Sequence, residues 1–308
     1  MKGIADLLEP QIKFKNNKGV PLSPVMQVCV CLNHYAGGHF QRITGLCGDI
    51  SQNAARESMI RVTDALVNLK AQFIFMSTED EMQETSKRMF HKYHLPRFCC
   101  AVDGMMVIFS EAPRKLPQNE NPQQFWCRKQ KYAENVQLVC NDRYILDLVL
   151  GWPGSTHDSR IWKRSEVKAY IESQRRFYIA GDSGYPISEV LLKPYSTNEA
   201  GRDPRKRLFN KRLSGIRTVM SECIFGCWKR RFPILKNMRT DFDLSQKIIL
   251  ATAVLFNLGR RWGDEEDSED EEEEEHERAE RAVVVEGDAA SVRLRGQVER
   301  DRLKDGMR

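Results

Sequence analysis

The sequence predicts an α/β fold in which helices pack on a sheet, with a helical region before it and a charged tail after it. Apolar, β-rich runs lie between residues 98 and 195, helical periodicity precedes and follows them, and acidic residues crowd the last part of the sequence. Hydrophobic residues make up 41% of the 308 residues and aromatic residues 9%, which suffices for a sizeable core and excludes wholesale disorder. No uncharged apolar stretch approaches the roughly 18 residues of a membrane span, and no secretory signal is expected, so the nine cysteines predict buried, reduced thiols.

Residues 22–95 form the predicted helical region, after an N-terminal extension over residues 1–21. Pro24 begins a helix that Gly37-Gly38 ends, and a longer helix follows with Ser51 as its candidate N-cap. A short helix, a glycine-containing turn and a longer helix form the outline of a helix-turn-helix, which contacts DNA with the start of its second helix. A plain helical bundle that braces the next domain fits the same pattern. The residues that the first interpretation offers to DNA are Gln52, Asn53 and Arg56.

Residues 96–262 form the predicted sheet domain. An apolar run at 98–109 predicts its first strand, and two further strands, at 135–140 and 144–152, flank the hairpin signal Asn141-Asp142-Arg143. Residues 176–186 read as another buried strand that ends in a carboxylate. Helices expected at 214–229 and 247–262 carry apolar stripes that pack on the sheet.

The net charge of +5 conceals a division between a basic body and an acidic tail. Residues 1–262 carry 40 basic and 25 acidic residues, whereas residues 263–308 carry 8 basic and 18 acidic ones and are predicted to be largely disordered. A basic body suits a protein that handles a polyanion such as DNA. Its densest basic stretch is also a candidate nuclear localisation signal, so we expect a nuclear protein with a cytoplasmic share. The cations of this stretch that we expect to contact nucleic acid are Arg205, Lys206, Arg207, Lys211 and Arg212.

Carboxylates occur at positions that solubility does not explain. Asp103 interrupts an apolar strand, Asp182 follows another, and Glu222 lies within the stripe of a helix, with Asp158 in a Gly/Pro-rich turn as a fourth. A buried carboxylate is costly unless it is paired, hydrogen-bonded or bound to a cation. Oxygen ligands alone suit Mg²⁺ or Mn²⁺. Paired core acids and a metal site both fit the pattern at this stage.

The blocks around these acids resemble the PIF/Harbinger superfamily of DDE transposases, and especially the Harbinger-transposase-derived nucleases. The resemblance covers residues 22–258 and is most specific over 134–165, which includes GWPGSTHDSRIWKRS. VDGMMVIFSEAP (102–113) is similar to the first-aspartate block, AGDSGYP (180–186) to the second, and SECIFGCWKRRFPIL (221–235) to the glutamate block. These blocks occur in the order that the family shows.

The resemblance implies an RNase H-like mixed sheet and a DNA endonuclease that depends on a divalent metal. Asp103, Asp182 and Glu222 are then the catalytic acids that hold two ions, and Asp158 is a further metal-associated residue. Lys229, seven residues after Glu222, is expected to steady a phosphate. His157 either positions a phosphate or caps the following helix. The resemblance also implies a Myb/SANT-like DNA-binding partner, and we expect no membrane contact and no organic cofactor.

The sequence departs from the family beside the acids. Met105-Met106 replace the usual Thr-His after the first aspartate. The arginine usually found four residues before the glutamate is Thr218, and Arg217 is displaced by one position, or about 100° of helical rotation. These changes leave an alternative open: a weak or inactive protein that retains the fold and binds DNA or a partner. A two-carboxylate glycosidase is a third possibility, but it leaves the basic surplus unexplained.

Overall fold

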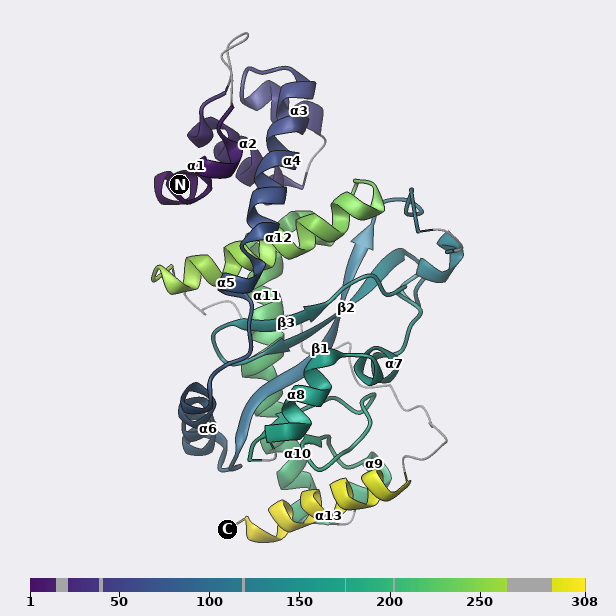
Figure 1. Cartoon of the computed structure of the whole chain (residues 1–308). Coiled ribbons are helices and arrows are strands. Elements are labelled where there is room, and N and C mark those ends of the chain that lie inside the picture. Colours follow the sequence, from purple (N-terminus) through teal and green to yellow (C-terminus); the bar gives the residue numbers. More distant parts are fainter. Residues whose placement is uncertain are drawn as a thin grey trace.

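The protein is described by a computed structural model that covers residues 1–14, 22–38, 41–117, 120–174, 176–201, 203–264 and 290–307. The chain forms three tiers, with the N-terminal helices at one end, the sheet in the middle and the C-terminal helix at the other end (Figure 1). None of the helices in these ranges combines the length and the apolar character that a membrane crossing requires.

A five-stranded mixed sheet forms the centre of the fold, in the order β3-β2-β1-β4-β5. The long central strand β1 pairs antiparallel with β2 and parallel with β4, so the predicted mixed α/β architecture is confirmed. Asn141 holds the predicted hairpin between β2 and β3, because its side-chain Oδ1 accepts hydrogen bonds from the backbone N–H groups of Arg143 and Tyr144. The strands are β1 (Phe98–Phe109), β2 (Tyr132–Cys140), β3 (Ile145–Val149), β4 (Tyr178–Ala180) and β5 (Leu191–Leu192).

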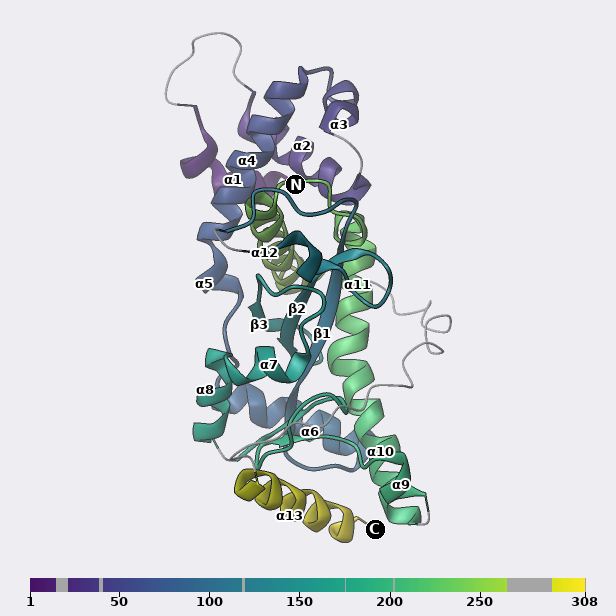
Figure 2. The ribbon, with the colours of Figure 1, turned by 90° about the vertical axis from the view of Figure 1, so that its right-hand side faces the viewer.

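Helices cover both faces of the sheet, and Figure 2 shows α10 and α11 as one continuous column along β1, with α7 and α8 on the opposite side. Because successive residues of a strand face opposite sides, Met105 of β1 packs in the core with α11 and α12, whereas Val102 packs in another with α7 and α8. The helices are α6 (Glu79–Tyr93), α7 (Asp158–Lys163), α8 (Glu166–Gln174), α9 (Thr197–Ala200), α10 (Pro204–Arg217), α11 (Cys223–Arg231) and α12 (Phe242–Arg261). Shorter helical turns are η1 (Pro122–Phe125), η2 (Thr218–Glu222) and η3 (Pro233–Lys236).

The N-terminal helices pack on one another and on α12. Ser23 and Ser51 cap two of them through side-chain hydrogen bonds from Met26 N and Ala54 N, as the sequence predicts for Ser51. Gly38, with φ of +58°, ends the first of these helices in the left-handed region, also as predicted. The extension before residue 22 contains a helix that joins the same core. The helices are α1 (Lys2–Ile12), α2 (Pro24–Gly37), α3 (Gln41–Cys47), α4 (Gln52–Asn68) and α5 (Lys70–Phe73).

The C-terminal tail ends in a helix, α13 (Ala290–Gly306), which the prediction of a largely disordered tail over residues 263–308 does not allow for. Arg300 of α13 is buried and its guanidinium lies 3.7 Å from the centre of the Tyr195 ring. The hydroxyl of Tyr195 in turn donates to Asp301, at 2.5 Å. The prediction is wrong for this part because the basic residues interleaved with its acids find partners on the sheet domain. Most of the acidic run at 264–277 lies outside the described residues.

Candidate active site

Asp103 lies in the middle of β1 with its carboxylate buried against the junction of α10 and η2. Its Oδ1 accepts a hydrogen bond from Gly104 N at 2.9 Å, and its Oδ2 accepts one from Arg217 Nη2 at 3.3 Å. The side chains of Asp103 and Arg217 are 9% and 16% exposed. A carboxylate this far from solvent requires a positive partner, and Arg217 supplies one.

Glu222 reaches the same guanidinium from the end of η2. Its Oε1 lies 3.8 Å from Arg217 Nη2, and its Oε2 accepts a hydrogen bond from Thr218 Oγ1 at 3.3 Å. The turn η2 is π-helical, so its backbone hydrogen bonds join residues five apart. The π turn therefore brings Arg217 onto the face of Glu222 although five residues separate them in sequence. Although Arg217 is displaced by one position from the usual arginine, it does contact Glu222, because the helix is not an uninterrupted α-helix here.

Asp182 lies just after the end of β4, the strand that pairs in parallel with β1. β4 runs parallel to β1 with Ala180 beside Ala101, so continuing this register places residue 182 alongside Asp103. Asp182 Oδ1 accepts a hydrogen bond from Gly184 N at 2.8 Å. Within the described part of the chain, no three Asp, Glu, His or Cys side chains converge closely enough to bind one metal ion. The structure therefore brings Asp103 and Glu222 to one guanidinium, and the role of Asp182 as a third ligand stays a prediction.

Asp158 lies on the other face of β1. A Cβ on Gly104 would stand only 2.5 Å from Asp158 Oδ1, so Asp158 occupies the space where residue 104 has no side chain. Because Gly104 directly follows Asp103 in a strand, this space is on the face opposite to the Asp103 carboxylate. Asn135 Nδ2 donates to Asp158 Oδ1 at 2.7 Å. The structure thus gives Asp158 an amide partner on this face, apart from Asp103 and Glu222, and its role as a metal ligand stays a prediction.

Asp103, Asp158 and Asp182 all influence the pKa of one neighbouring residue, Tyr185. The phenol of Tyr185 is buried, and this burial is the main reason why its pKa lies well above the usual value. Nearby negative charges raise this pKa further, those of Asp158, Asp103 and Asp182. Tyr185 therefore stays neutral, and it packs in the same core as Val102 and Trp162.

Alanine at position 104 is expected to destabilise the fold by about 1–3 kcal/mol, as for other overpacked sites. The added methyl group would collide with Asp158 and also lie 2.9 Å from Asn135 Oδ1. Urea unfolding measures the loss. Gly226→Ala is the matched control, because its Cβ would meet only Arg230 Nη1, at 4.0 Å, in a helix that alanine favours. Equal stabilities for the two variants would contradict the packing described here.

The donor set on the Asp103 face fits a divalent cation. Carboxylate oxygens from β1 and η2 share one positive charge, that of Arg217, whose buried Nε has no hydrogen-bond partner within the described structure. The guanidinium thus occupies the position between two hard oxygen ligands that a divalent metal cation would take.

The residues predicted to contact nucleic acid lie on α4, α10 and α11. Gln52, Asn53 and Arg56 are exposed at the start of α4. Lys229 lies two helical turns after Glu222 on α11 and is half-buried. His157 precedes α7 at the N-cap position but makes no capping hydrogen bond with its side chain, so the capping interpretation is not supported.

The predicted basic stretch lies on α10, where α13 and the preceding turn engage much of it. Arg205 lies 3.9 Å from Asp305 of α13, and Lys206 lies 5.0 Å from the centre of the Tyr195 ring. Arg207 Nη1 donates to the backbone carbonyl of Gly201 at 2.9 Å. Arg212 is half-buried and points to the carbonyl of His94 at 3.5 Å, whereas Lys211 is exposed. The stretch is therefore less available to DNA than its sequence indicates.

Sequence reasoning missed the buried carboxylate of Glu134 on β2. It accepts hydrogen bonds from Gly151 N and Gln246 Nε2 and so ties the Gly-Trp-Pro-Gly segment to α12. Burial raises its pKa to about 7. The signal was present in the sequence, because Glu134 begins the apolar run of the second strand.

Replacing Glu134 with glutamine is expected to remove a pH dependence of stability. The pKa of Glu134 is higher in the folded state than the usual value of 4.5 for a glutamate, so the folded state binds the proton more tightly. Its stabilising contribution is complete below about pH 4.5 and is lost as the pH rises through about 7. Each pKa unit corresponds to about 1.4 kcal/mol, so the free energy of unfolding of Glu134→Gln relative to wild type should rise by up to about 3 kcal/mol between pH 5 and 8.

Urea unfolding at several pH values measures this difference. The exposed Glu57→Gln variant is the control and should follow the wild-type pH profile. The same profile for wild type and Glu134→Gln would show that Glu134 is ionised in the folded state across the range.

Residues 102–257 match the family described as DDE superfamily endonuclease. The match covers more than half of the chain and includes all four acids, so the chain belongs to the DDE superfamily endonucleases. It is similar to the protein named "Putative nuclease HARBI1": 27% identical over 270 residues in Rattus norvegicus and over 268 in Homo sapiens, covering 84% of this chain and 74% of each relative. It is 24% identical to "Protein ALP1-like" of Arabidopsis thaliana, over 82% of this chain and 65% of that protein. The predicted resemblance to Harbinger-derived nucleases is thus confirmed.

Proposed function

We propose that this chain is a DNA endonuclease that hydrolyses phosphodiester bonds with Mg²⁺ or Mn²⁺, on an RNase H-like sheet. The observation that carries the proposal is that Asp103 and Glu222, 119 positions apart in the sequence, reach the same guanidinium nitrogen. Membership of the endonuclease family supports the same reading.

In this proposal Asp103 and Glu222 hold the divalent cation on one face of β1, and Asp182 joins them from the end of β4. When bound, the cation would activate a water and stabilise charge on the phosphate. The chain's own residues orient the acids: Gly104 N holds one oxygen of Asp103, and Thr218 Oγ1 holds one oxygen of Glu222. Lys229, on the helix that follows Glu222, would steady a phosphate.

Cleavage of supercoiled DNA tests the proposal. We expect nicking by the wild-type chain with Mn²⁺, no nicking with EDTA, and loss of nicking in Asp103→Asn. Equal nicking by wild type and Asp103→Asn would assign the activity to a contaminant or to another site.

A second candidate, a catalytically weak protein that keeps DNA or partner binding, is favoured by one observation. The Arg217 guanidinium already lies between both acids and offsets part of their charge, so a metal ion would compete with it. Met105, buried on the same face of β1 as Asp103, adds an apolar thioether where the family resemblance implies a hydroxyl. Calorimetric titration with Mn²⁺ separates the two candidates, since the weak protein would show no uptake that depends on Asp103.

Nuclear localisation and a Myb/SANT-like partner belong to the same proposal. The basic stretch on α10 is the candidate import signal, and its exposed members include Arg205 and Lys211. A fluorescent fusion that stays nuclear after both are replaced with glutamine would contradict this assignment.

A further inference from the structure

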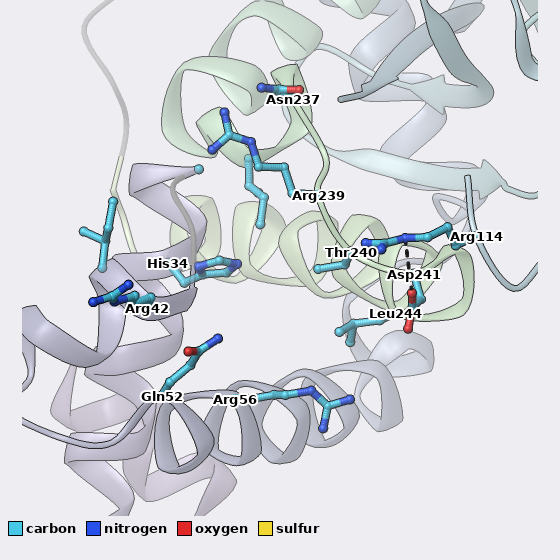
Figure 3. A pocket seen from close by; sticks show the side chains of 13 residues that line it. His34, Arg42, Gln52, Arg56, Arg114, Asn237, Arg239, Thr240, Asp241 and Leu244 are labelled. Carbon is cyan, nitrogen blue, oxygen red and sulfur yellow. Dashed lines mark ion pairs between the residues drawn. The ribbon is translucent and has the colours of Figure 1, made fainter. Parts of the chain in front are cut away.

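A cleft of about 500 Å³ lies between the N-terminal helices and the sheet domain (Figure 3). It is remote from the acids and collects arginines that sequence reasoning did not connect. Arg42 and Arg56 come from α3 and α4, whereas Arg114 and Arg239 come from the segments after β1 and before α12. Gln52 and Asn237 add amide groups, one on each wall.

The cleft carries an excess of positive charge. Among the residues that line it, Asp241 is the one carboxylate against four guanidinium groups. Asp241 is itself shared, since Lys115 Nζ lies 2.6 Å from its Oδ2 and Arg114 Nε lies 4.0 Å from its Oδ1. Positive groups that face each other from two walls attract an anion.

The local structure aims these groups into the cleft. Gln52 is the first residue of α4, and Arg56 follows one turn later on the same face. On the other wall, Met238 N donates to Ile108 O at 2.7 Å and Ser110 N donates to Met238 O at 2.9 Å. These bonds hold the segment with Asn237 and Arg239 in parallel alongside the end of β1. Figure 3 shows Gln52 and Arg56 on one side of the cleft facing Arg239 and Arg114 on the other.

We infer that this cleft binds the phosphodiester backbone of duplex DNA, as a non-catalytic phosphate clamp between the helical region and the sheet domain. Guanidinium and amide donors are the groups that contact phosphate and sugar without reading base sequence. The net charge of +15 over residues 1–262 favours such a ligand. The inference rests on the proposed function only in taking DNA as the ligand, and it is independent of cleavage.

The position of the cleft suits a duplex that also reaches the acids. The cleft adjoins the end of β1 at Phe109, six residues beyond Asp103. Six residues of a strand span about 20 Å. One turn of DNA is about 34 Å long, so a single turn can contact the clamp and the acids together.

Fluorescence anisotropy with a short labelled duplex in EDTA tests the clamp. We expect Arg56→Gln and Arg239→Gln each to weaken binding severalfold. In the double variant, the slope of log affinity against log salt concentration should fall by about two, since each phosphate contact contributes about 0.9. Arg143→Gln, an exposed arginine in the turn at the opposite end of the sheet, is the matched control and should bind as wild type. Thermal melts of the Arg56→Gln, Arg239→Gln and Arg143→Gln variants should match that of the wild type.

Three results would overturn the inference. The double variant could match Arg143→Gln in both affinity and slope. It could lose affinity for inorganic triphosphate but keep its affinity for the duplex, which would indicate a pocket for a small polyphosphate. It could also bind the duplex more tightly than wild type, which would indicate that an acidic peptide, such as residues 264–277 of this chain, occupies the cleft. A wild-type chain that fails to nick DNA but shows the expected slopes would contradict the nuclease and leave the clamp standing.

Discussion

Asp103→Asn is expected to lower Mn²⁺-dependent nicking of supercoiled DNA by about a hundredfold or more. Even partners of metal ligands typically contribute 10–100-fold, and Asp103 is proposed as a ligand itself. Asparagine preserves the size of the side chain, and its oxygen can still accept from Gly104 N, so the strand is retained. What is lost is the negative charge that faces Arg217. The initial rate of conversion from supercoiled to open circular DNA measures the effect.

Two companion variants sharpen this experiment. Glu222→Gln should show a comparable loss, because it removes the second carboxylate at the same guanidinium. Asp64→Asn, whose exposed carboxylate pairs with Lys247 at 2.7 Å, should nick as wild type. Loss of nicking in Asp64→Asn as well would point to a general effect on the protein and would leave the acids unassigned.

Arg217→Gln is expected to reduce the free energy of unfolding by about 3–5 kcal/mol at neutral pH without metal. Removing one partner of a buried pair is strongly destabilising, and the substitution removes the ion pair that Asp103 makes with Arg217. Mn²⁺ should restore more of this stability than it adds to the wild-type chain, because the cation no longer competes with the guanidinium. Urea unfolding with and without Mn²⁺ measures both quantities.

Arg88→Gln is the matched control for this stability experiment. Arg88 Nε lies 2.7 Å from Asp142 Oδ2 in a partly buried pair at the hairpin between β2 and β3. Its loss should destabilise the fold, but Mn²⁺ should not compensate. Equal recovery of the two variants with Mn²⁺ would show that Asp103 and Glu222 do not form the cation site.

Features that depend on local sequence were predictable. The apolar run of β1, the Asn141 hairpin, the Ser51 cap and the glycine end at Gly38 all follow from short-range preferences, and the structure has each of them. The elements that carry the acids were predictable for the same reason.

The predictions that failed concern features that no local sequence pattern encodes. The π turn at η2 is not marked by any periodicity of the sequence, and it brings Arg217 and Glu222 together. Asp158 belongs to α7 and lies against Gly104 of β1. Because side chains alternate along β1, this contact is on the face opposite to Asp103. The cleft arginines come from four separate segments, so only the tertiary fold brings them together.

The docking of α13 has a consequence for the basic stretch of α10. Arg300 of α13 is buried against Tyr195, and Asp305 near the end of α13 lies 3.9 Å from Arg205. Because α13 is part of the same chain, its carboxylates keep a fixed effective concentration beside α10. Diluting the protein would not separate them from the stretch, whereas a proteolytic cut between the sheet domain and α13 would.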